Sequence, residues 1–109
     1  MGINIGDTLQ LINGLTAKNT YGCIENNSIN IFKKIVTGGN NNNSYTVKFV
    51  LQAVGSIWAN KGIRNSNGSI IKNTNIKIEY ENDTFLNQNV YGLLYAKWKE
   101  DYTTVTDDI

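Results

Sequence analysis

Short segments in which apolar and polar residues alternate dominate this 109-residue chain, and they constrain its fold more than any other feature. Successive side chains of a β-strand point to opposite faces of a sheet, so such alternation is typical of strands with one buried and one solvated face. No window longer than about ten residues combines an apolar period of 3.6 residues with helix-capping residues. The pattern therefore predicts an all-β protein and excludes parallel strands joined by helices.

The strongest predicted strand spans residues 45–54, which are rich in β-branched and aromatic side chains. Four of its apolar side chains alternate and share one face: Val47, Phe49, Leu51 and Ala53. Because so regular an apolar face needs cover from neighbouring elements, we expect this strand at the centre of the sheet. Residues 75–81 alternate as regularly, with charged side chains between the apolar ones, and they predict a strand with one solvated face.

Further strands are predicted at residues 8–11, 21–24, 29–36, 85–90 and 91–98. Within 29–36 the alternation changes phase, and a β-bulge near Lys33 and Lys34 would bring the apolar residues on both sides of it to one face. In 91–98 the alternation places Leu94, Ala96 and Trp98 together.

Glycine and asparagine mark the predicted turns. Asn13-Gly14 follows the first strand, and Asn67-Gly68 favours a type I′ turn in a hairpin from Trp58 to Ile71. Residues 37–44 offer little apolar surface and predict a mobile surface loop. The tail, residues 100–109, is predicted to be partly frayed.

The chain has the commonest size of one domain, so residues 1–109 are predicted to form a single β domain. Short strands separated by Gly and Asn turns favour an antiparallel β-sandwich of jelly-roll type. A β-trefoil and a small barrel are the alternative architectures, because both are also built from short antiparallel strands.

Two parts of the chain share a polar-led alternating strand followed by a Tyr-Gly strand: residues 7–11 with 21–24, and 74–78 with 91–94. Over about a third of the chain this pattern resembles the repeated units of β-trefoil lectins. The middle unit lacks the pattern, and the Gln-Trp signature of ricin-type repeats is absent. No site residue is carried over from that family.

The composition excludes most catalytic chemistry. The chain contains no histidine, which removes the commonest general base and the usual zinc ligand. Cys23 is the only cysteine, so no intrachain disulfide can form and no histidine can activate the thiol. The neighbouring carboxylates, Glu79 with Glu81 and Asp107 with Asp108, are predicted to be solubilising charges. We therefore expect a non-enzymatic protein with no catalytic residues, no metal site and no cofactor.

Ten basic and nine acidic residues leave a net charge of +1, so no field of the whole molecule would steer it to nucleic acid. The first residues carry neither a basic segment nor an apolar run of signal-peptide length, and no later stretch reaches the roughly 18 apolar residues of a membrane span. These features predict no membrane span and a protein that is cytoplasmic or released without a classical signal peptide.

The predicted function is carbohydrate binding by a lectin-like module. An exposed aromatic ring covers the apolar face of a sugar while amides and carboxylates bind its hydroxyls, and this needs no net charge. The predicted ligand-binding residues come from turns and aromatic positions: Asp7, Trp58, Asn60, Asn65, Asn67, Asp83, Tyr91 and Trp98. The expected partner is a carbohydrate or glycoprotein, and homo-oligomers would add avidity.

Other interpretations use the same residues differently. Trp98 can be a core residue, and Asp7 can bind the backbone of its own turn. The alternative function is a structural or assembly subunit, such as a virion, tail or matrix component, in which exposed strands make contacts between copies. Lysine pairs near aromatic residues also suggest single-stranded nucleic acid, which the near-zero net charge makes us not expect.

Overall fold

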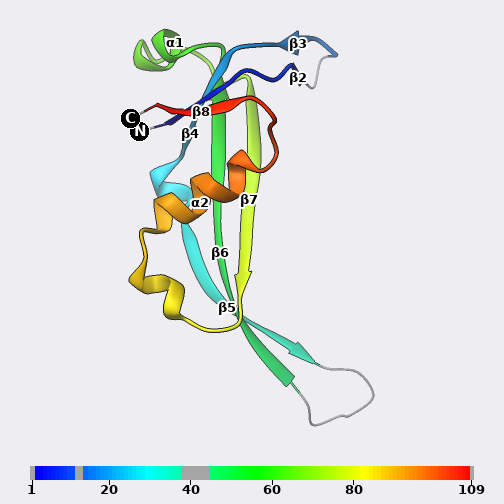
Figure 1. Cartoon of the computed structure of the whole chain (residues 1–109), viewed down its shortest axis with the longest axis vertical. Coiled ribbons are helices and arrows are strands. Elements are labelled where there is room, and N and C mark those ends of the chain that lie inside the picture. Colours follow the sequence, from blue (N-terminus) through cyan, green and yellow to red (C-terminus); the bar gives the residue numbers. More distant parts are fainter. Residues whose placement is uncertain (1, 12–13, 38–44, 109) are drawn as a thin grey trace.

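The computed structural model describes residues 2–11, 14–37 and 45–108. Six of its strands form one antiparallel sheet: β1 (Gly2–Ile5), β4 (Thr20–Ile24), β5 (Asn30–Thr37), β6 (Tyr45–Trp58), β7 (Lys72–Tyr80) and β8 (Val105–Asp108) (Figure 1). The order is β5-β6-β4-β1-β8, and β7 pairs with the other edge of β6. The short strands β2 (Leu9–Gln10) and β3 (Thr16–Ala17) form a separate ribbon. The prediction of a mostly antiparallel β structure is confirmed.

Strand β6 is central, as predicted, and it has two successive partners along one edge. Its first half pairs with β5 and its second half, from Gly55 to Trp58, pairs with β4. Between the two partners the chain leaves the ladder through the 3-10 helix η1 (Asn26–Ser28). There the Val54 amide donates to Ser28 Oγ at 2.8 Å, and the Glu25 amide donates to the Val54 carbonyl at 2.9 Å. The backbone of β6 therefore remains hydrogen-bonded across the interruption.

The predicted bulge at Lys33 and Lys34 is wrong, because the ladder between β5 and β6 runs without a shift from Asn30 opposite Gln52 to Thr37 opposite Tyr45. The change of phase in the sequence has another cause. Apolar side chains lie on both faces of this hairpin and remain exposed: Ile31 at 41%, Phe32 at 38% and Ile35 at 69%. Figure 1 shows that the hairpin extends beyond the rest of the molecule, where no layer covers either face.

Most of residues 85–98 are helical, and the two strands predicted there are wrong. The chain forms the 3-10 helix η2 (Thr84–Asn87) and then α2 (Val90–Lys99), which packs across the sheet (Figure 1). Asn89 Oδ1 caps α2 by accepting from the amides of Tyr91 and Gly92. Leu94 and Trp98 are four residues apart, and residues with this spacing lie on one face of a strand and also on one face of a helix. Their spacing therefore did not distinguish a strand from a helix.

Helix α2 covers the sheet face on which the second sheet of a sandwich was expected. No sheet closes into a barrel within the described part of the chain. The core lies between α2 and the sheet, and Trp98, which is 1% exposed, is its largest member. Its ring lies against Gly22 and Gly55, where an added Cβ would come within 2.6 and 2.7 Å of ring carbons. These two glycines make the slot that admits the indole.

The opposite face of the sheet carries a smaller cluster of Tyr21, Cys23 and Trp58. Ile63 of α1 (Lys61–Asn65) packs against it. Strands β6 and β7 pair as the predicted hairpin requires, but α1 stands in their connection in place of a tight turn. Asn67 has a φ of 60° and ends the α1 turn, so the Asn67-Gly68 signal marks a left-handed residue after a helix.

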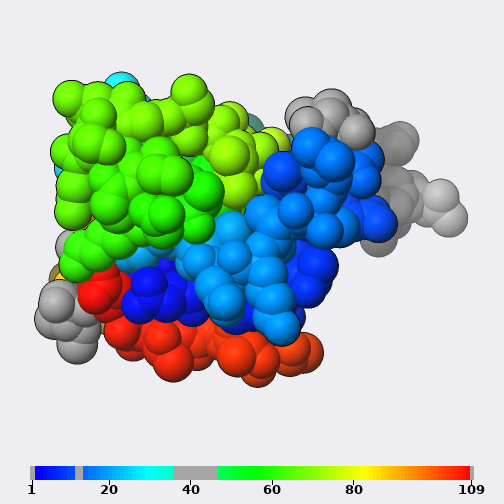
Figure 2. Space-filling model, turned by 90° about the horizontal axis from the view of Figure 1, so that it is seen from above, coloured from blue at the N-terminus to red at the C-terminus, as the bar shows by residue number. Residues whose placement is uncertain are grey.

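Within the predicted tail, β8 pairs with β1 over four residues. Figure 2 shows these terminal segments, blue and red, side by side on the surface. Asp107 pairs with Lys99 at 2.9 Å and Asp108 pairs with Lys61 at 2.6 Å. Gly14, the second residue of the predicted Asn13-Gly14 turn, has a φ of 82°. Asn13 and residues 38–44 of the predicted loop lie outside the described residues.

Candidate functional site

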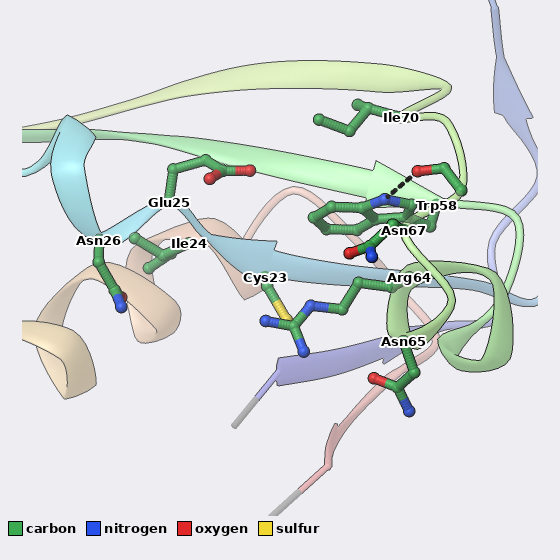
Figure 3. Close-up of a pocket in the computed structure, with 10 residues that line it drawn as sticks. Cys23, Ile24, Glu25, Asn26, Trp58, Arg64, Asn65, Asn67 and Ile70 are labelled. Carbon is green, nitrogen blue, oxygen red and sulfur yellow. Dashed lines mark hydrogen bonds between the residues drawn. The ribbon is translucent and has the colours of Figure 1, made fainter.

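A pocket opens on the sheet face opposite α2, between the end of β4 and the segment that carries α1 (Figure 3). Its volume is about 560 Å³, within the range of pockets that hold small ligands. Its lining is largely polar and comprises Cys23, Ile24, Glu25, Asn26, Trp58, Arg64, Asn65, Asn67, Gly68 and Ile70. Three of the eight predicted ligand-binding residues therefore meet here: Trp58, Asn65 and Asn67.

The wall formed by residues 65–68 is held in place from both sides. Asn60 Oδ1 caps α1 by accepting from the Ile63 amide at 2.9 Å. At the other end the Gly68 amide donates to the Ile63 carbonyl at 2.7 Å, and the Trp58 indole N–H donates to the Gly68 carbonyl at 3.2 Å. The side-chain amides of Asn65 and Asn67 are thus carried on a backbone that is held by hydrogen bonds.

Trp58 is a wall of the pocket rather than an open stacking surface. Only 8% of the residue is exposed, and its indole N–H is used by Gly68. The Arg64 guanidinium lies over the ring, 5.8 Å from the ring centroid. The attraction between the cation and the ring favours this orientation of the guanidinium.

The pocket contains two opposite charges that sequence reasoning missed. Glu25 comes from the end of β4 and Arg64 from α1, and Figure 3 shows the Arg64 guanidinium extending toward Cys23. Within the described residues, neither Glu25 nor Arg64 takes part in an ion pair. One signal was available, because Arg64 is the only arginine of the chain.

The other predicted site residues lie elsewhere and serve the fold. Asn60 caps α1 and does not line the pocket. Asp83 is exposed and precedes η2, at the opposite end of β7 from α1. Trp98 is buried in the core, so the protein covers its ring faces. Tyr91 is half-buried in the first turn of α2, and its hydroxyl donates to Asn26 Oδ1 at 3.0 Å, at the margin of the pocket.

Asp7 binds a turn of its own chain. One carboxylate oxygen accepts from the amide and hydroxyl of Thr103, both at 2.9 Å, and the other accepts from the Thr104 amide at 2.6 Å. The pKa of Asp7 is lowered mainly because these backbone amides stabilise the charged form. The carboxylate therefore joins the connection after β1 to the connection before β8.

Of the neighbouring carboxylates Glu79 with Glu81 and Asp107 with Asp108, three are paired with lysines: Glu79, Asp107 and Asp108. Glu79 lies 3.3 Å from Lys34, and hydrogen bonding to that lysine lowers the pKa of Glu79. Asp107 pairs with Lys99 at 2.9 Å and Asp108 pairs with Lys61 at 2.6 Å. Across residues 2–11, 14–37 and 45–108, no group of three or more metal-ligating side chains could hold a metal ion. None of the helices described is long and apolar enough to cross a membrane.

A second surface of interest is the projecting part of β5 and β6, which we call the hairpin surface. It comprises the exposed apolar side chains Ile31, Phe32 and Ile35 together with Lys33, Lys34 and Lys48. Ile31, Lys33 and Ile35 share the face turned toward the side of α2, and Phe32, Lys34 and Lys48 share the other.

Comparison of the chain with models of protein families, curated protein sequences and solved structures finds no match.

Proposed function

We propose that the protein is a non-enzymatic assembly subunit whose hairpin surface docks onto another copy of the chain. The observation that carries the proposal is the exposure of apolar side chains on both faces of a projecting hairpin. Ile35 is 69% exposed, and Ile31 and Phe32 are about as exposed as many polar surface residues. Water-exposed apolar groups gathered on one projecting element are typical of an interaction surface.

The distribution of charge favours another copy as the partner. Residues 29–54 hold three of the ten basic residues and none of the nine acidic ones, so this segment carries +3 and the rest of the chain −2. Lys34 is paired with Glu79 of β7, so Lys33 and Lys48 supply the charge that the hairpin surface can offer to a partner. Two hairpin surfaces placed face to face would bring like charges together, which disfavours a symmetric contact between hairpins. A head-to-tail contact, in which the hairpin meets the acidic remainder of the next copy, is favoured instead.

The segment before α2 offers complementary chemistry for that contact. Leu86 on η2 is 50% exposed, and the exposed carboxylates of Glu81 and Asp83 precede it in the chain. An apolar side chain that follows two acidic residues matches a hairpin that carries Ile35 with Lys33. Repetition of such a contact produces rings or filaments, depending on whether the rotation between copies closes.

Light scattering coupled to size-exclusion chromatography tests the proposal over a range of protein and salt concentrations. We expect larger species as protein concentration rises, and dissociation at high salt because the charge attraction is screened. Ile35→Asp should yield the monomer at every concentration. The matched control is Leu15→Asp, which changes a 62% exposed apolar residue outside the hairpin and should leave assembly unchanged.

Two outcomes would overturn the proposal. The first is a wild-type chain that stays monomeric at all concentrations tested. The second is assembly that survives Ile35→Asp, which would show that another surface makes the contact. Circular dichroism of each variant establishes that the substitution has not unfolded the chain.

A further inference from the structure

The pocket beside α1 takes no part in the proposed assembly through the hairpin surface. Its lining combines one cation, one anion and several amides, and the cation is not neutralised by a carboxylate of the described chain. A surface arginine outside any ion pair is ordinary, but the Arg64 guanidinium lies over the Trp58 ring, 5.8 Å from its centroid. This contact restricts the side chain and so reduces the entropy lost when a ligand binds.

The amides of the pocket are also positioned before any ligand arrives. Asn67 adopts the left-handed conformation, with a φ of 60°, and lies between residues whose backbone is hydrogen-bonded to α1. The next residue is Gly68, where an added Cβ would collide with Ile63 Cγ2. On the opposite side, Asn26 Oδ1 is held by the Tyr91 hydroxyl at 3.0 Å. The polar groups therefore come from two separately braced segments.

From these features we infer that the pocket binds a saccharide that carries a carboxylate. The planar guanidinium of Arg64 matches a carboxylate, to which it can donate two parallel hydrogen bonds. The side chains of Asn65 and Asn67 offer donors and acceptors for hydroxyls, and the Glu25 carboxylate accepts from them. The exposed side chain of Ile70, 44% exposed, provides an apolar contact for the C–H face of the sugar.

The same residues argue against two other anionic ligands. A phosphate carries more negative charge than a carboxylate, and Glu25 in the same pocket would repel it while Arg64 is the only cation in the lining. A small inorganic anion would engage Arg64 alone and leave most of the roughly 560 Å³ and the amides unused. A singly charged ligand rich in hydroxyls uses all of these groups.

Isothermal titration calorimetry at low salt tests the inference with three sugars of one shape: D-glucuronate, its neutral methyl ester and D-glucose. We expect glucuronate to bind and the two neutral sugars to bind about tenfold more weakly or worse, since a charge-assisted pair is lost. Arg64→Gln should reduce glucuronate affinity by about tenfold or more. Arg64→Lys should retain only part of the wild-type affinity, because the lysine ammonium cannot donate the two parallel hydrogen bonds of the guanidinium. Lys97→Gln, which removes the same charge from α2, is the matched control and should bind as the wild type does.

Equal binding of glucuronate and glucose, or no binding of any of the three sugars, would overturn the inference. Acetate binding as tightly as glucuronate would show a simple anion site and would also overturn it. Ile35→Asp leaves the pocket untouched and should bind glucuronate normally, and Arg64→Gln should assemble normally. The failure of one proposal is thus distinguishable from the failure of the other.

Discussion

The Ile24 amide donates a hydrogen bond to the Tyr95 hydroxyl at 3.0 Å, across 71 positions of the sequence. Ile24 is the last residue of β4, at the point where the chain leaves the edge of β6. Tyr95 comes from the buried face of α2, and burial raises the pKa of its hydroxyl. Helix and sheet are therefore joined by a polar contact as well as by the packing of Trp98.

Tyr95→Phe tests this contact. The substitution leaves a buried amide without its acceptor, and we expect the free energy of unfolding to fall by about 1–3 kcal/mol. Urea denaturation followed by circular dichroism measures the change. Tyr91→Phe is the control, because its hydroxyl bonds to Asn26 at the exposed surface and its loss should cost less. Equal losses in the two variants would contradict the role given to burial.

Gly55→Ala tests the slot for the indole. The new Cβ would come within 2.7 Å of Trp98, and neither the ring nor the central strand has room to move without disturbing the core. We expect destabilisation of about 1–3 kcal/mol, as for other overpacked cores. Gly92→Ala is the opposite case. Its Cβ would meet nothing nearer than 3.9 Å in the first turn of α2, so thermal unfolding should show equal or greater stability.

Asn89→Ala tests the N-terminal cap of α2. The Asn89 side chain satisfies two amides of the first turn, and loss of such a cap costs about 1 kcal/mol. We expect a lower denaturation midpoint with an unchanged dependence on denaturant, because the surface exposed on unfolding stays the same. An unchanged midpoint would show that the packing of Trp98 alone fixes the helix.

Asp7→Asn tests the link between the two terminal segments through its pH dependence. Because the pKa of Asp7 is lowered in the folded protein, its carboxylate stabilises the fold above the unfolded value of about 3.9, and this contribution is lost as pH falls through the folded pKa. The thermal midpoints of wild type and variant should differ most at neutral pH and converge in acid. A difference that stays constant down to pH 2 would contradict this assignment. Asp83→Asn, at an exposed carboxylate that makes no cap bond to η2, is the control.

Strands whose alternation reflects one buried face could be predicted from the sequence. In β7, Ile76 is buried while Lys77 and Glu79 are exposed, so the period of two and the burial agree. The interruption at η1 could not be predicted, because it depends on Ser28 replacing a ladder partner of Val54 from 26 positions away. In the hairpin the alternation does not correspond to burial, since exposed apolar residues lie on both faces.

Prediction of α2 failed because its helical signals are short. Leu94 and Trp98, four residues apart, satisfy both periods, and only the buried Tyr95 beside the exposed Ala96 separates them. The site was predicted in part. Asn65 and Asn67 were predicted as ligand-binding residues because they lie in turns, and both line the pocket. Trp58 and Trp98, predicted as exposed aromatic residues, are largely covered by the rest of the protein. Exposure of an aromatic residue depends on which elements fold over it, and local sequence does not encode this.

Strand β6 runs unbroken from the projecting hairpin to Trp58, which lines the pocket. Tension on the hairpin along this strand would load the whole row of hydrogen bonds to β7 together, in shear, rather than opening them one after another. A subunit held by its hairpin would therefore transmit mechanical force directly into its most strongly paired strand.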